Sequence, residues 1–411
     1  MKHFKIILSL FMLLAFLSMV ASSGFTAVAL LVSLIGLAMF MPSPKIDGNI
    51  NRSDISPDIA AIQKYVASIK PSLLRKYFNG LAIINDITFQ PNVANKLVLP
   101  KLIVTGKPRP YTGNHKPNAA DIGYGDRELI VDDFQRDIAI DPRKYRNTYL
   151  SKFRPAGSGA NSNVIPFAEY TVETILLQNA SMLNNHTAWK GLGRSAFSNY
   201  NPATAYVVGN RIKFTGADEE PHYYICKTNT NAGESPTTHP AKWDNKDELA
   251  VAEGLGTKLK AGRTAGSILS ASTGVITKAD GHEQALTVYR TLPEELRNQA
   301  PDVRLYGSSD TIDLITDGFK DTIGKYTSPD GKITYLPKTD NKCQLVKASW
   351  MNGSGALVAS PQSNLYIGTD LLSDLNTINT VPQVYHLDMG LTGVIGFQYA
   401  DDEAVVMNDQ N

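Results

Sequence analysis

The pattern that most constrains this chain lies between residues 343 and 407, where apolar and polar residues alternate in short runs. Gly and Asn interrupt these runs at close spacing, as in Trp350–Ala359 and again in Met389–Tyr399. Alternation with a period of two, broken by turn-forming residues, predicts short β-strands joined by tight turns. The same region contains no nucleophile–base pair and no metal-ligand spacing. It therefore predicts a packed sheet rather than a site of chemistry.

Length and composition allow a large hydrophobic core. The chain has 411 residues, 43% of them apolar, so by length it can hold two or three domains. Its 40 Lys and Arg residues are balanced by 39 Asp and Glu residues, which leaves a net charge of +1. A dedicated nucleic-acid-binding protein normally carries a clear excess of basic residues. The composition therefore argues against that class of function.

Sequence signatures of catalysis and of cofactor binding are missing. There is no Walker-type phosphate loop, no GxGxxG, no HExxH and no GxSxG. The seven histidines form no ligand-spaced pair, and the acidic pairs Asp132–Asp133 and Asp401–Asp402 are interpreted as solvated loop charges. Catalytic triads are recognised by geometry rather than by spacing, but nothing here favours an enzyme. The sequence predicts no catalytic residue, no cofactor and no metal site.

The chain has two cysteines, Cys226 and Cys343, far apart and without CxxC or metal-type spacing. This arrangement predicts two buried free thiols, with a single disulfide as the alternative.

The amino terminus is strongly apolar. No charged residue occurs from Ile6 to Met41, Lys2, His3 and Lys5 precede this run, and Ser22–Gly24 divides it into two blocks. Three interpretations stay open. The run is a signal peptide, a helical hairpin whose blocks are near the lower length limit for spanning a bilayer, or a leader upstream of a start at Met39 or Met41.

The next part of the chain predicts an arm, strands and a long loop. A capping Ser56 followed by Pro57 predicts the start of an amphipathic helix that Pro71 interrupts. Residues 81–104 are strand-like, residues 106–126 form a turn-rich polar loop, and residues 128–140 predict a strand pair that enters a helix at 141–146. An irregular loop as long as residues 106–126 is usually functional or lies in an interface.

Helical periodicity returns at Pro166 and continues through Trp189, with Gly191 as the end signal. A helix of about 24 residues is about 36 Å long. Further on, shorter helices are expected around 285–298 and 309–325, with a strand at Val303–Tyr306 between them.

Residues 198–246 differ from both flanks, because aromatic and turn residues recur at short spacing in about 50 residues. The order is Tyr206, Gly209-Asn210, a strand to Phe214, Gly216, Tyr223-Tyr224, Gly233, Pro236 and Trp243. The segment resembles the small carbohydrate-binding module of bacterial chitinases and predicts a three-stranded β unit. That family commonly stacks sugars on tandem exposed tryptophans, where this chain has Lys227–Asn231. The candidate glycan contacts Tyr206, Tyr224 and Trp243 are therefore expected mainly to form the core of the module.

The carboxy-terminal pattern resembles the major capsid proteins of tailed phages, with the Hong Kong ninety-seven-type fold. The matching features are the turn Trp350–Ser354, the strand Ala356–Pro361, the segment Asn364–Asp370 and the late strand Gly393–Gln398. The apolar amino terminus departs from that family, whose removable leader is usually charged and helical.

This resemblance implies an α+β capsid fold with a small all-β insertion, and the following division of the chain: 1–41 apolar leader or anchor, 42–104 N-terminal arm and first strands, 105–160 extended loop, 161–197 spine helix of the peripheral domain, 198–246 inserted module, 247–380 axial domain, and 381–411 strands returning to the peripheral domain. This resemblance also implies self-assembly into hexamers and pentamers of an icosahedral virion shell.

The other implied partners are packaged DNA on the inner face without sequence specificity, portal and scaffold or protease proteins, and surface glycans. The balanced net charge is compatible with a shell that encloses DNA without gripping it.

The alternative hypothesis is an exported or membrane-anchored carbohydrate-binding protein. Residues 1–41 are then its signal or anchor, and residues 198–246 are its sugar-binding module.

Overall fold

The computed structural model describes a defined set of residues: 81–104, 110–111, 122–141, 166–298, 303–320, 324, 327, 331, 333–370, 377–383 and 386–410. The predicted amino-terminal arm and leader, and the helix expected at 141–146, lie outside this set apart from Asp141. The described residues form a mixed α+β architecture, as the sequence predicts.

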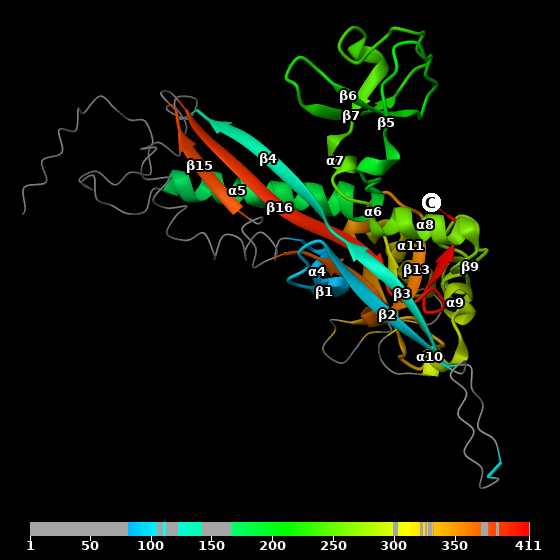
Figure 1. The fold of residues 1–411 in the computed structure, drawn as a ribbon. Helices are drawn as coiled ribbons and strands as arrows, with labels where there is room; N and C mark the ends of the chain where they lie inside the picture. Colours follow the sequence, from blue (N-terminus) through cyan, green and yellow to red (C-terminus); the bar gives the residue numbers. More distant parts are fainter. Residues whose placement is uncertain are drawn as a thin grey trace, which may run out of the picture. The chain divides into compact units, whose positions relative to one another are not determined.

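A five-stranded sheet is organised around one long strand, β16 (Leu387–Tyr399). Strand β16 pairs with β4 (Asp132–Ile140) and β15 (Thr377–Pro382), beside which it lies in Figure 1, and with β14 (Leu365–Gly368). Strand β1 (Thr88–Gln90) pairs with β14. Strands β16 and β4 are antiparallel, with Leu387 opposite Ile140 and Ile395 opposite Asp132. Buried residues of β4 and β16 share one apolar cluster with Leu176 and Ala180 of the long helix, so this sheet packs against that helix.

The long helix predicted from Pro166 is present, with one π-helical turn inside it. It runs as α5 (Pro166–Met182), a π-helical turn (Leu183–Thr187) and α6 (Ala188–Lys190). The π turn holds a buried Asn184, whose Oδ1 accepts a hydrogen bond from Ile83 N and whose Nδ2 donates one to Ser349 Oγ. Gly191 ends the helix as predicted, and a Cβ at this position would overlap the carbonyl oxygen of Ala252.

A second sheet has six strands in the order β11 (Thr334–Tyr335), β12 (Cys343–Lys347), β10 (Val303–Gly307), β13 (Leu357–Pro361), β17 (Val406–Asn408) and β9 (Leu269–Ala271). Its apolar cluster includes residues of α9 (Gly281–Thr291) and α11 (Ser309–Lys320). The expected strand at 303–306 and the helices near 285–298 and 309–325 are present, with Pro293 separating α9 from α10 (Glu294–Asn298). Strand β17 belongs to this sheet, so strand pairing crosses the boundary expected at residue 380.

Two segments differ from the sequence expectations. Ile83–Asp86, expected as strand, form a short helix α4, because tertiary bonds override the strand preference of isoleucine: Ile83 N binds Asn184, and Tyr306 OH donates to Asp86 O. Residues 122–126, expected as loop, begin strand β3 (Ile122–Ile130). Pairing with β2 (Lys96–Val104) outweighs the weak strand preference of Gly123 and Gly125.

The segment Ser198–Asn245 forms its own four-stranded sheet in the order β5 (Ser198–Asn199), β6 (Arg211–Thr215), β7 (Pro221–Cys226) and β8 (Trp243–Asn245). The expectation was three strands; the fourth is the two-residue β5, parallel to β6 and too short to carry a periodic signal. Helices α7 (Asp247–Ala250) and α8 (Leu255–Ala265) follow. Cys226 and Cys343 are both buried and free, as predicted.

Candidate interaction surfaces

The aromatic residues singled out in the inserted segment pack on one another. Tyr206 and Trp243 are buried, with ring centroids 5.4 Å apart, and Tyr200 stacks on Tyr206 at 5.7 Å. The Trp243 indole donates to the carbonyl of Glu234 (3.2 Å). Tyr224 is half-buried and meets Phe214 edge-on. The faces of Tyr206 and Trp243 are thus covered by neighbouring rings, as expected for a small core, and glycan binding by any of these three residues stays a prediction.

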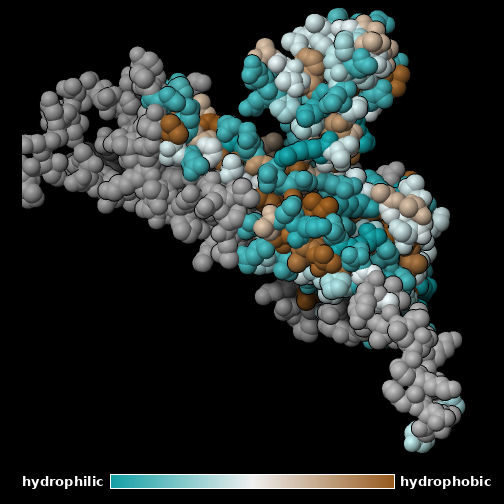
Figure 2. Space-filling model, in the orientation of Figure 1, coloured by the Kyte–Doolittle hydropathy of each residue, from teal (hydrophilic) through white to brown (hydrophobic). Residues whose placement is uncertain are grey.

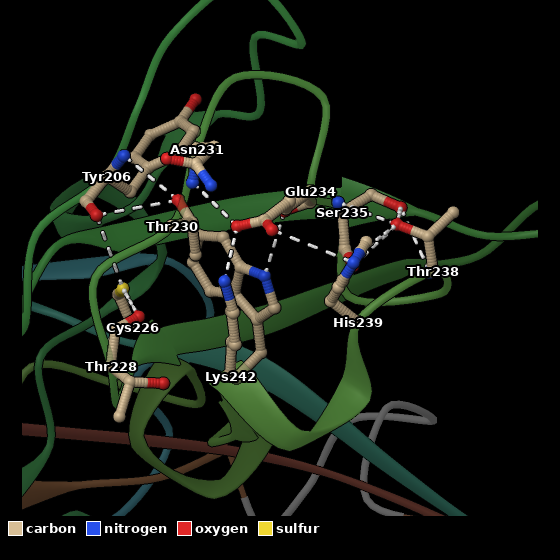
Figure 3. Close-up of polar contacts among 11 residues, drawn as sticks. Tyr206, Cys226, Thr228, Thr230, Asn231, Glu234, Ser235, Thr238, His239 and Lys242 are labelled. Carbon is tan, nitrogen blue, oxygen red and sulfur yellow. Dashed lines mark hydrogen bonds and ion pairs between the residues drawn. The ribbon is translucent and has the colours of Figure 1, made fainter.

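A polar cluster beside this core holds the long loop between β7 and β8 (Figure 3). Glu234 Oε2 accepts hydrogen bonds from Asn231 N and from Lys242 Nζ, both at 2.6 Å. The same contacts hold the pKa of Glu234 below its usual value, with the Lys242 hydrogen bond as the largest cause. Ser235 and Thr238 exchange hydrogen bonds between hydroxyl and backbone amide. These bonds replace regular secondary structure in the loop, so we assign this cluster a structural role.

The two ends of the module lie side by side. Leu192 and Glu253 form an antiparallel bridge, and Gly254 N donates to Gly191 O (2.9 Å). Next to them, Leu192 N donates to Leu249 O (2.7 Å) and Thr187 Oγ1 donates to Glu248 O (2.9 Å). The chain therefore leaves and re-enters the main body through one narrow joint, as an inserted domain requires.

Strands β2 and β3 form a two-stranded ribbon that pairs with no further strand among the described residues. One face of its base is buried against β14 and β16 through Leu99, Leu129 and Val394. On the other face Val98 is 45% exposed and Ile130 is 48% exposed. Figure 2 shows apolar side chains gathered on an otherwise mainly hydrophilic face, where β3 leads into β4. We call Val98 and Ile130 the ribbon patch.

Ion pairs fasten the ribbon to the loop that follows β16. Lys101 Nζ lies 2.6 Å from Asp401 Oδ1 and 3.6 Å from Glu403 Oε1. Arg127 pairs with Asp402 and places its guanidinium 4.2 Å from the centre of the Tyr399 ring. The acidic pair Asp401–Asp402, interpreted from sequence as solvated loop charge, instead binds both ribbon strands.

The sequence did not predict the ribbon patch, the ion pairs of the ribbon, or the hydrogen bonds at both ring nitrogens of His222, which lies near the joint. The ion pair of Lys101 with Asp401 joins residues 300 apart, and His222 lies 25 residues from Asp247 but only four from Asp218; an isolated pair of this kind leaves no periodic signal. Across the described part of the chain, no group of three or more His, Cys, Asp or Glu residues is placed to hold a metal ion. Within that same part no helix is both long and apolar enough to span a membrane; the apolar run at 6–41 lies outside it.

No protein-family model matches the sequence, and comparison with curated proteins gave no match. Among solved structures, the chain is similar to the procapsid of satellite phage P4 including its size-determination protein, with a TM-score of 0.46 and 12% identity over 82% of this chain and 89% of that one. It is similar to the capsid of Myoviridae phage XM1, with a TM-score of 0.40 and 9% identity over 80% and 91% of the two chains. For Microbacterium phage Oxtober96 the TM-score is 0.40, with 11% identity over 91% and 98%.

These TM-scores are below 0.5 and the identities are far below 25%, so the likenesses by themselves assign no function. The mixed α+β architecture is consistent with the phage capsid fold expected from the sequence.

Proposed function

We propose that this chain is a capsid subunit that assembles with copies of itself into the head shell of a tailed phage. The observation that carries the proposal is the β2–β3 ribbon. An isolated two-stranded ribbon is at best marginally stable in water and needs a further surface to pack on. Here one face of the ribbon base is buried within the chain, while the ribbon patch on the other face is left open. A repeated neighbouring subunit supplies the missing surface.

Two further features support a shell subunit. One apolar cluster joins the five-stranded sheet, one face of the six-stranded sheet and the long helix, and a second cluster joins the six-stranded sheet to α9 and α11. The peripheral domain, spine helix and axial domain that the sequence resemblance implies are part of this proposal. The inserted module has its own core and a narrow joint, which suits an outward decoration. Enclosed DNA, portal and scaffold or protease partners, and surface glycans belong to this proposal as expectations.

The test is a charge substitution in the ribbon patch. In the double variant Val98→Lys and Ile130→Lys, both side chains are about half exposed, so the subunit should fold while contact with a neighbour is blocked. The control is Val208→Lys, which charges an exposed valine (62%) on the module. Light scattering should detect large uniform particles for the wild type and the control, and monomers or small oligomers for the double variant. Equal particle formation by all three proteins would refute the role of the ribbon.

The alternative, a carbohydrate-binding protein, has weaker support because the aromatic faces are largely covered. Strong binding of the wild-type chain to chitin or another glycan, lost in a folded Tyr224→Ala variant, would favour it.

A further inference from the structure

His222, on strand β7 of the module, is held between two carboxylates. Its Nδ1 lies 2.8 Å from Asp247 Oδ2, and its Nε2 lies 2.8 Å from Asp218 Oδ2. Asp218 belongs to the turn between β6 and β7, whereas Asp247 is the first residue of α7, on the path back to the main body. The histidine therefore connects the module to its joint.

Asp247 also binds the backbone of the same strand. Its Oδ1 accepts a hydrogen bond from Tyr223 N (2.7 Å), and Lys246 N donates to Tyr223 O (2.7 Å). Two residues further on, Leu249 O accepts from Leu192 N of the entering chain. The Asp247 side chain is therefore one of the links between β7 and the segment that anchors the module. We call this set of contacts the joint clasp.

The geometry itself depends on the protonation of His222. A carboxylate only accepts hydrogen bonds, and a neutral imidazole has one donor and one acceptor nitrogen. Both contacts at 2.8 Å are hydrogen bonds only when the ring is doubly protonated. In the neutral ring, one nitrogen lone pair faces a carboxylate oxygen, and that contact becomes repulsive.

The other charged groups on the surrounding elements do not supply a positive charge in place of the protonated His222. The turn between β6 and β7 adds Glu219 and Glu220, and α7 adds Glu248, all of which are acidic. Lys246 is directed to Glu248, with 3.9 Å between Nζ and Oε1. On β6, the residue paired with His222 is Phe214, which carries no charge.

We propose that the joint clasp is a pH-dependent lock: with His222 charged it fixes the module to the main body, and with His222 neutral it releases the module to move. This inference goes beyond the proposed function and holds whether or not the chain forms a shell.

The direction of the pH response follows from the same contacts. The hydrogen bond with Asp247, and next the one with Asp218, raise the pKa of His222 above its ordinary value of 6.5. A histidine whose pKa is raised on folding stabilises the folded state fully below the ordinary value, and this contribution is lost as the pH rises through the raised pKa. The lock is therefore closed in acid and opens on the alkaline side.

Hydrogen exchange of the full chain, corrected for the intrinsic effect of pH, tests the lock. We expect protection of the Tyr223 and Leu249 amides to fall about two- to tenfold between pH 6 and pH 8.5, the range for a charge-assisted contact at a partly exposed site. His222→Gln should show the low protection at every pH. The matched control His239→Gln removes another histidine of the module and should follow the wild type.

A second variant keeps the test decisive if His222→Gln perturbs the fold. Asp218→Asn removes one carboxylate from a largely exposed position, so the step in protection should move to lower pH. The proposal is overturned if the wild type shows no step, if His222→Gln keeps the wild-type step, or if Asp218→Asn leaves its midpoint unchanged.

Discussion

The substitution Trp243→Ala tests whether the module is a separately stabilised unit built on its aromatic core. Trp243 is 5% exposed, packs against Tyr200 and Tyr206, and donates its indole N–H to Glu234 O. Truncating a buried Trp to Ala costs about 3–5 kcal/mol, and the lost hydrogen bond adds about 1 kcal/mol. A domain of about 50 residues has only a few kcal/mol of stability. We expect the module to unfold while the main body stays folded.

The chain carries a reporter in each part. Cys226 is fully buried in the module core, and Cys343 is fully buried under the six-stranded sheet. Alkylation of native protein, followed by peptide mapping, should show Cys226 reacting faster in Trp243→Ala while Cys343 stays protected. A loss of about 3 kcal/mol corresponds to an increase of about 150-fold in the open population, at about 1.4 kcal/mol per tenfold.

Trp243→Phe is the control, because it keeps an aromatic ring in the core and should leave Cys226 largely protected. Unchanged protection of Cys226 in Trp243→Ala would refute the reasoning, since the indole would then contribute little to the module. Simultaneous exposure of Cys343 would show that module and main body unfold as one unit.

Three other substitutions have defined outcomes. Replacing Ser198–Lys246 with a short Gly/Ser linker should leave assembly and Cys343 protection intact, because the ends meet at the Leu192–Glu253 bridge; loss of soluble assembly would place the module in the main core. His282 is 8% exposed, and burial lowers its pKa, so stability should fall as the pH drops below about 6.5. His282→Leu should remove this loss in urea unfolding at pH 5 and 8, and an equal loss in the variant would contradict it. Gly191→Ala should lower the melting temperature by several degrees because its Cβ would overlap Ala252 O, whereas at the control Gly355→Ala the Cβ meets only Gln410 at 3.6 Å; equal melting temperatures would contradict this.

Regular patterns along the sequence predicted most of the elements. Period-two alternation located β16, and helical periodicity between Pro166 and Gly191 located the long helix. The first half of β16 alternates buried and half-buried residues, so its sequence repeats, whereas Gly393–Tyr399 are all buried. The π turn inside that helix was not predicted; the partners of its buried Asn184, Ile83 and Ser349, are distant in sequence.

The interaction surfaces were less predictable for the same reason. The aromatic order in the module indicated a small core, and Tyr206 and Trp243 are buried there. By contrast, no feature of the sequence places His222 between Asp218 and Asp247. Such contacts depend on how strands and turns meet in space, and an exposed valine such as Val98 becomes meaningful only when the opposite face of its ribbon is known to be buried.

The central claim is that copies of this chain build a closed shell, and electron microscopy of the purified wild-type chain tests it most directly. The account predicts uniform, closed particles in which the ribbon patch of one subunit lies against a neighbouring subunit. A monodisperse monomer at high protein concentration, with no particles in any buffer, would contradict it.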